Sequence, residues 1–239
     1  MILSTLKQKS RDELLTLAQK YKVLPRRLKK AELAEAIYNA YWLKEAKKYP
    51  KKSNLGKPGK EGTVYQTTYR RKDYALKQFR PTKVIGNIYK EAELQQQAAK
   101  KGIAPKVIAI NPVEKFIVME KMDRSLMDVI KKYRGKIPQK YQKQIIHLIE
   151  NLDKVRIFHG DPNPMNFMEK DGRFYIIDFG FAKPVDQKLI TELASDFPNQ
   201  KFMYIGLLIQ FKEIFGGNFV DCKLIRNKIN KEERERLGI

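Results

Sequence analysis

The sequence has one cysteine, Cys222, among 239 residues, and it has no long hydrophobic run. A single cysteine cannot form an intramolecular disulfide, which favours a reducing compartment. The most apolar stretch, residues 202–211, is too short to cross a bilayer, and residues 1–10 lack the apolar centre of a signal peptide. We therefore expect a cytoplasmic protein without a transmembrane segment, and we leave nuclear, virion and secreted-effector locations open.

Acidic residues are also scarce, at 27 against 49 lysines and arginines, which gives a net charge of +22. Such a charge attracts nucleic acid, anionic lipid, nucleotides or acidic proteins without choosing among them. A solvated, lysine-rich surface explains it equally well. The length and the hydrophobic content of 42% suffice for one two-lobed domain, or for a smaller domain with an appendage.

Residues 1–50 predict a small helical segment. Ser10 and Glu13 have the spacing of a capping box, and apolar residues then recur at helical spacing as far as Tyr21. A second helix is expected from about Lys30, before Pro50. Residues 51–62 are rich in glycine, proline and lysine, as in a linker.

Residues 55–120 predict a small, mostly antiparallel sheet with one inserted helix. The segments TVYQTTY, DYALKQF, KVIAI and KFIVME are rich in β-forming residues, whereas IYKEAELQQQAAKKG has helical composition and ends in glycine. The rest of the chain is mainly helical. The apolar residues of YQKQIIHLIENLDKV fall on one helical face, and His147 on that helix is interpreted as a surface or packing residue.

Four motifs follow one another along the chain: LGKPGKEGTVY, YALKQF, HGDPNPMN and IIDFG. Their order and spacing resemble those of the protein-kinase-like superfamily over residues 55–217. This resemblance implies an α+β, bilobal fold with a small antiparallel N-lobe and a reduced helical C-lobe. The expected organisation is a helical module at 1–50, an N-lobe at 51–122 and a C-lobe at 123–239.

The resemblance assigns the phosphate and adenine contacts of the N-lobe. Gly59, Gly62 and Val64 fit the second half of the kinase glycine-rich loop, whose backbone approaches the ATP phosphates. The first glycine of that pattern is replaced by lysine, so this loop is a variant. Lys77 corresponds to the lysine that holds the α- and β-phosphates, and Ala75 would contact adenine.

Further N-lobe assignments depend on neighbouring segments. Glu91 is the preferred ion-pair partner of Lys77, with Glu93 as the alternative, because KEAEL resembles a segment of RIO kinases and of the KEOPS kinase subunit. Met119 would be the gatekeeper of the adenine pocket. The backbones of Glu120 and Met122 would face the adenine edge.

The remaining motifs imply the catalytic and metal-binding groups. Asp161 would accept or orient the proton of the acceptor hydroxyl. Asn166 and Asp178 would bind Mg²⁺ through oxygen atoms, and Met168 would lie beneath adenine. Because all the expected catalytic residues are present, an active, ATP- and Mg²⁺-dependent kinase of protein serine or threonine is favoured over an inert pseudokinase.

Several features depart from the common protein-kinase pattern. Gly160 replaces the arginine that pairs with a phosphorylated activation loop, Asn163 replaces a lysine, and no A-P-E sequence follows Gly180. In the apolar helix near Gly206, Lys201 takes the place of an anchoring aspartate. These differences predict constitutive activity, or activation by a bound partner. They also keep small-molecule phosphotransferases as an alternative class.

The N-terminal segment weakly resembles a SAP- or Rho-N-like module. Residues 1–52 contain 14 basic and 5 acidic residues, with Arg26, Arg27, Lys29 and Lys30 clustered at the expected turn. Nucleic-acid binding through this module, and a nucleic-acid-associated ATPase of the RIO or KEOPS-kinase type, are therefore alternatives. A helical hairpin packed on the kinase domain is the simpler interpretation.

Overall fold

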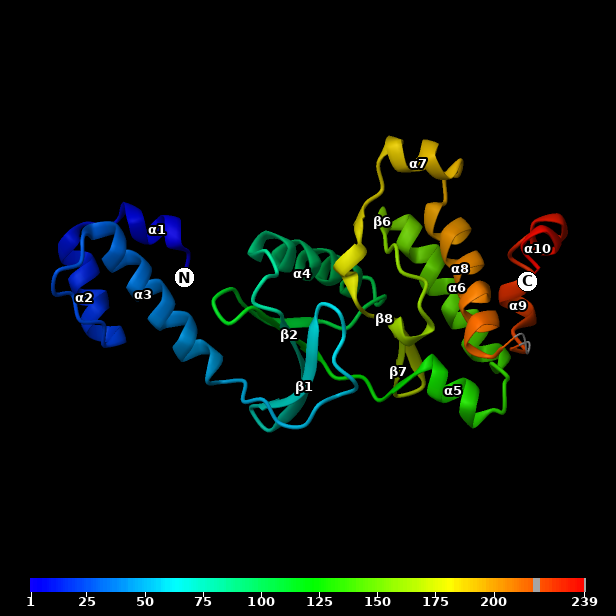
Figure 1. Ribbon diagram of the computed structural model, residues 1–239, viewed down its shortest axis with the longest axis horizontal. Helices are drawn as coiled ribbons and strands as arrows, with labels where there is room; N and C mark the ends of the chain where they lie inside the picture. Colours follow the sequence, from blue (N-terminus) through cyan, green and yellow to red (C-terminus); the bar gives the residue numbers. More distant parts are fainter. Residues whose placement is uncertain (217–219, 239) are drawn as a thin grey trace. The chain divides into compact units, whose positions relative to one another are not determined.

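The computed structural model describes residues 1–216 and 220–238. The chain divides into two compact units: the first contains residues 1–88 and 108–118, and the second contains residues 89–107 together with the chain from Met119 onward. Helices and antiparallel strands occur together, and the later part is mainly helical (Figure 1). The predicted α+β class is therefore confirmed. Within the described ranges, no helix has both the length and the apolar character needed to span a membrane.

The first unit begins with a small helical group. Its helices are α1 (Leu3–Gln8), α2 (Arg11–Tyr21) and α3 (Lys30–Ala46). The predicted capping box precedes α2: the Glu13 amide donates to the Ser10 hydroxyl at 3.2 Å, and the Ser10 amide donates to the Glu13 carboxylate at 2.8 Å. The group has its own core of buried apolar residues, namely Leu6, Leu14, Ala18, Leu33, Ala34 and Ile37.

A four-stranded sheet in the order β1-β2-β4-β3 follows. The elements of this region are β1 (Gly62–Tyr69), β2 (Lys72–Phe79), α4 (Ile85–Ala99), β3 (Val107–Asn111) and β4 (Phe116–Glu120). β1 and β2 form an antiparallel hairpin from Gly62 opposite Phe79 to Tyr69 opposite Lys72. All four predicted strands and the inserted helix are thus present.

The end of α3 and the segment that follows it pack on this sheet. Ala46 and Tyr49 contact the buried cluster of Leu76, Phe116 and Val118. The Asn111 side-chain amide donates to the Trp42 carbonyl at 2.7 Å. The end of α3 is therefore held to the sheet by both apolar and polar contacts.

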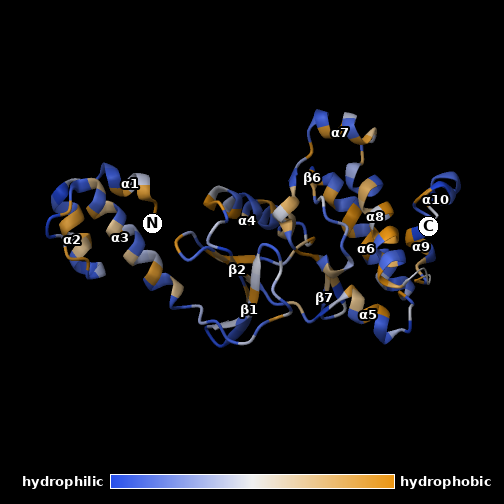
Figure 2. Ribbon diagram, in the orientation of Figure 1, coloured by the Kyte–Doolittle hydropathy of each residue, from blue (hydrophilic) through white to orange (hydrophobic). Residues whose placement is uncertain are grey.

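The second unit is built around α6 (Gln139–Lys154) and α8 (Pro198–Ile214), which lie side by side (Figure 1). Both helices carry hydrophobic residues (Figure 2) that join one large core. The other elements are β5 (Arg124–Ser125), α5 (Leu126–Lys132), β6 (Ile157–Phe158), η1 (Pro164–Asn166), β7 (Phe167–Lys170), β8 (Arg173–Ile176), η2 (Phe179–Phe181), β9 (Lys183–Pro184), α7 (Gln187–Leu193), α9 (Lys223–Arg226) and α10 (Lys231–Leu237).

Two short strand pairs carry the later motifs. β7 and β8 form an antiparallel hairpin whose turn residues, Asp171 and Gly172, both have positive φ. This is the geometry that an Asp-Gly hairpin turn favours. β6 pairs with β9, which places Phe158 opposite Lys183 and ties the segment after the DFG sequence to the strand before the catalytic loop.

Candidate active site

The glycine-rich segment of the first unit is a hairpin. The Leu55 amide donates to the Val64 carbonyl, and the Gly59 amide donates to the Gly62 carbonyl, both at 2.8 Å. A Cβ on Gly62 would lie 1.9 Å from the Gln78 carbonyl oxygen, so this close approach to β2 admits only glycine. Gly59 has no comparable close neighbour: a Cβ there would come no nearer than 3.6 Å to another atom.

Lys77 and Ala75 lie on β2, and both are buried. Val64 is directly opposite Lys77 in the hairpin. The Lys77 ammonium lies 3.7 Å from the Glu61 carboxylate and 5.1 Å from the centre of the Phe79 ring. The sequence analysis missed Glu61, although its place between two loop glycines was the available signal.

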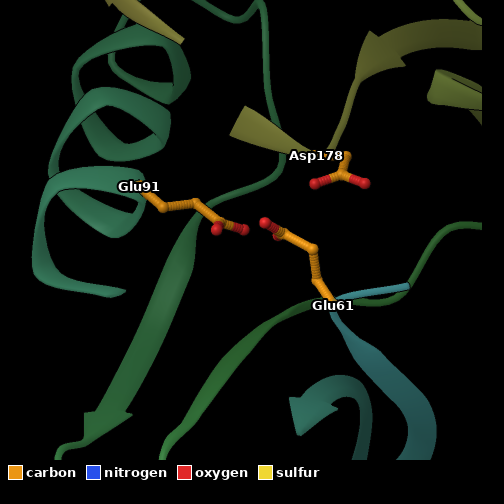
Figure 3. Close-up of side chains that lie close together, drawn as sticks. All are labelled: Glu61, Glu91 and Asp178. Carbon is orange, nitrogen blue, oxygen red and sulfur yellow. The ribbon is translucent and has the colours of Figure 1, made fainter. Parts of the chain in front are cut away.

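Glu91 and Asp178 belong to the second unit. Glu91 on α4 is buried, whereas Glu93 is exposed. A carboxylate oxygen of Glu91 lies within 4.8 Å of one of Asp178 (Figure 3). Burial thus distinguishes the two glutamates, and it supports the choice of Glu91 over Glu93.

A buried histidine holds the catalytic loop of the second unit. One ring nitrogen of His159 lies 3.1 Å from the Asp161 carbonyl oxygen, and the other lies 3.0 Å from that of Ile177. Burial lowers the pKa of His159, and these carbonyls and the carboxylates of Asp161 and Asp178 offset only part of that effect. A neutral imidazole carries one N–H, which donates to one of these two carbonyls, and the buried ring lies between the catalytic loop and the strand that leads to Asp178.

Asp161 and Asn166 contact each other directly. The Asn166 side-chain amide donates to one Asp161 carboxylate oxygen at 2.8 Å, while the Asn163 backbone amide donates to the other at 3.1 Å. The Ile177 amide also donates to the Asn166 carbonyl at 2.9 Å. The loop therefore fixes the orientation of the Asp161 carboxylate before any ligand binds.

The anchor of this loop is Asn199, which the sequence analysis missed. Its side-chain oxygen accepts from the His159 backbone amide at 2.9 Å, and its side-chain nitrogen donates to the Asp153 carboxylate at 2.7 Å and to the Ile157 carbonyl at 2.8 Å. The expected anchor position was Lys201, which is exposed. Asn199 performs this role two residues earlier, at the start of α8.

Two glycines shape the same loop. A Cβ on Gly206 would lie 2.3 Å from a ring carbon of Pro162, so α8 approaches the catalytic loop closely at this point. Gly160 has φ of +80°, and a Cβ there would lie 3.1 Å from the Phe181 carbonyl oxygen. A backbone of this kind disfavours the arginine that usually stands at this position.

The available ligands fit a magnesium ion. Asp178 has φ of +65°, a conformation that aspartate tolerates better than most residues. The side chain of Asn166 uses its nitrogen as donor to Asp161, so its oxygen retains acceptor capacity. Carboxylate and amide oxygens are the hard ligands that Mg²⁺ prefers.

The residues expected around adenine lie mostly on strands. Met119 and Glu120 end β4, Met122 follows it, and Met168 lies on β7 opposite Tyr175. Met119 and Met122 are buried. The Glu120 backbone amide donates to the Lys106 carbonyl at 3.0 Å. Their proposed contacts with adenine remain predictions.

Comparison with known proteins identifies the family. Residues 49–197, more than half of the chain, match the protein kinase domain family, so the chain belongs to that family.

Two curated proteins are also similar over part of the chain. One is a probable serine/threonine-protein kinase BUD32 homolog of Archaeoglobus fulgidus, which is 30% identical over 93 residues, or 38% of this chain and 44% of that protein. The other is the probable serine/threonine-protein kinase mps1 of Dictyostelium discoideum, which is 30% identical over 56 residues, or 23% of this chain and 6% of that protein. The chain therefore matches less than half the length of either relative.

Proposed function

We propose that this protein transfers the γ-phosphoryl group of ATP, with Mg²⁺, to serine or threonine of a protein acceptor. The observation that carries this proposal is the hydrogen bond between Asp161 and Asn166, in a loop that buried His159 joins to the strand before Asp178. Membership of the protein kinase family supports the reaction class, and the names of the two relatives support the choice of serine and threonine.

In this proposal the second unit supplies the acceptor and metal groups. Asp161 orients the acceptor hydroxyl and accepts its proton, and its fixed carboxylate reduces the reorganisation needed in the transition state. Asn166 and Asp178 would hold Mg²⁺, which neutralises charge on the phosphates when bound. Glu91 would position Lys77.

The first unit would hold the nucleotide. The hairpin that contains Gly59, Gly62 and Val64 would cover the phosphates, and Lys77 would bind the α- and β-phosphates. Ala75 would contact adenine, together with the residues of the second unit assigned above, namely Met119, Glu120, Met122 and Met168.

Regulation by loop phosphorylation lacks its usual charge partner because Gly160 stands in the arginine position. The pairing of β6 with β9 already joins the start of the activation segment to the catalytic loop. We therefore expect constitutive activity, or activation by a bound partner, and in either case phosphatase treatment should not abolish the activity.

The test uses purified protein, Mg²⁺, labelled ATP and generic basic and acidic protein acceptors. Asp161→Asn and Asp178→Asn should each reduce label transfer by a factor on the order of 10² to 10⁴. Asp171→Asn is the matched control, because this aspartate lies in the exposed β7–β8 turn and undergoes the same chemical change.

The products separate the proposal from its alternatives. Phosphoserine or phosphothreonine in the acceptor supports a protein kinase. ATP hydrolysis stimulated by nucleic acid, with no labelled protein, would instead indicate an ATPase in which the basic residues 1–52 contact phosphates. Nucleotide binding with neither reaction would indicate a pseudokinase, and label on a small alcohol alone would indicate a small-molecule phosphotransferase.

A further inference from the structure

Lys83 is a partly buried lysine that none of the four motifs uses. It lies between β2 and α4, and its side chain is 14% exposed, close to the 11% of Lys77. Lysine is almost never buried unless it is paired. Among 49 basic residues, this burial so near Lys77 distinguishes Lys83 from the exposed lysines of the glycine-rich hairpin, Lys57 and Lys60.

The Glu61 carboxylate lies close to both Lys83 and Lys77. Glu61 places one oxygen 2.5 Å from the Lys83 ammonium and the other 3.7 Å from the Lys77 ammonium. Both ammonium groups also lie near the Phe79 ring, at 5.1 Å for Lys77 and 5.6 Å for Lys83 from its centre. The two ammonium groups, the Glu61 carboxylate and an aromatic face therefore meet at the base of the hairpin.

One of the two Glu61 carboxylate oxygens lacks a hydrogen bond among the described residues, and this oxygen is buried. Its distance of 3.7 Å to Lys77 is that of an ion pair, beyond hydrogen-bond range. Leaving a buried acceptor without a hydrogen bond costs free energy, so the Glu61 carboxylate is not an optimal partner at this position.

We propose that Lys83 is a second phosphate-binding lysine and that Glu61 is an internal anion, which a phosphate of the nucleotide replaces between Lys83 and Lys77. This inference rests on the proposed function, since the nucleotide is its ligand. A phosphate group offers more acceptor oxygens than a carboxylate and carries at least as much negative charge, so it can satisfy two ammonium groups together.

This replacement has opposite consequences for the two residues. Lys83 contributes binding energy to the phosphates, so its loss weakens binding. Glu61 competes with the phosphates for the same cations, so its loss strengthens binding. Glu61 also pairs with the partly buried Lys83 when no nucleotide is bound, and its removal therefore destabilises the nucleotide-free protein.

The experiment measures ADP and adenosine binding by calorimetry, and thermal unfolding without nucleotide, for the full chain and its variants. Lys83→Gln should weaken ADP binding by roughly ten- to a hundredfold, as expected for a lost hydrogen bond to a charged group, and should leave adenosine binding unchanged. Lys83→Arg should retain ADP binding within about threefold, because the positive charge is kept. Glu61→Gln should tighten ADP binding and lower the melting temperature.

Lys60→Gln is the matched control, because it removes the same charge from an exposed residue of the same hairpin. If Lys83→Gln weakens ADP binding no more than Lys60→Gln does, or weakens adenosine binding equally, the role of Lys83 is wrong although the proposed function stands. If Glu61→Gln lowers both affinity and melting temperature, Glu61 is only structural and the replacement is wrong. Absence of ADP binding by the wild-type protein would overturn both proposals.

Discussion

The catalytic loop of the second unit and the glycine-rich hairpin of the first are held by different means. Buried side chains fix the catalytic loop: His159, Asn166 and Asn199 each bond to backbone or carboxylate atoms in or behind it. The residues of the hairpin from Leu55 to Lys60 are largely exposed, and the ammonium groups of Lys77 and Lys83 lie near the carboxylate of Glu61.

This difference follows the chemistry that each region would perform. A group that orients a hydroxyl gains from a fixed position, because reorganisation in the transition state adds to the barrier. A loop that covers phosphates must admit and release a nucleotide. Side-chain anchoring therefore suits the first task, and an exchangeable ion pair suits the second.

The largest expected effect comes from removing the anchor of the catalytic loop. Asn199→Ala deletes the side-chain hydrogen bonds to His159, Asp153 and Ile157, and it removes a donor from the buried Asp153 carboxylate. We expect the free energy of unfolding to fall by about 2–4 kcal/mol, measured by urea denaturation.

Lys201→Ala is the comparison variant, because Lys201 is exposed on the same helix and should change stability by no more than about 0.5 kcal/mol. If both variants lose the same free energy of unfolding, Asn199 is not the anchor of the catalytic loop.

A smaller effect is expected where α8 meets the catalytic loop. Gly206→Ala would place a Cβ 2.3 Å from a Pro162 ring carbon, and we expect a loss of about 1–3 kcal/mol from overpacking. Gly86→Ala, in α4, meets no atom within 4 Å and should stabilise the protein by up to about 1 kcal/mol. Opposite shifts in melting temperature would support the close contact, whereas a stabilising Gly206→Ala would contradict it.

The smallest expected effect is a pH dependence from His159. Its pKa in the folded protein is lowered from an ordinary value near 6.5, so the unfolded chain binds the proton more readily. The stability from neutral His159 is complete above pH 6.5 and is lost as the pH falls below it, toward the lower pKa of the folded state.

The slope of melting temperature against pH, measured between about pH 7.5 and about pH 5.5, tests this dependence, because histidine titrates within that range. His159→Asn should reduce the slope, and exposed His147 offers the control, since His147→Asn should retain it. If the melting temperature of His159→Asn changes with pH as much as that of the wild-type protein, groups other than His159 cause the pH dependence.

Local patterns accounted for much of the fold. The Ser10 capping box and the β1–β2 pairing depend on residues close in sequence, and each was predicted. The motif that contains Asp161 and Asn166 was recognised for the same reason: the two partners of one hydrogen bond are only five positions apart.

The missed residues act over longer separations. Asn199 is bonded to His159, 40 residues earlier, and no spacing rule in the sequence predicted that contact. Lys83 is one lysine among many, and only its burial beside Glu61, 22 residues away, distinguishes it. α1 was also missed because a helix of six residues carries little periodicity.

Tyr49 shows how far the helical segment and the sheet depend on each other. Its ring lies 5.0 Å from that of Tyr69 and 6.2 Å from that of Phe116, and the family match begins at this residue. A shortened chain starting at residue 51 would leave these apolar surfaces uncovered, together with the Asn111 amide that Trp42 satisfies. Anyone who prepares the catalytic part alone should therefore retain α3, or expect a protein that aggregates.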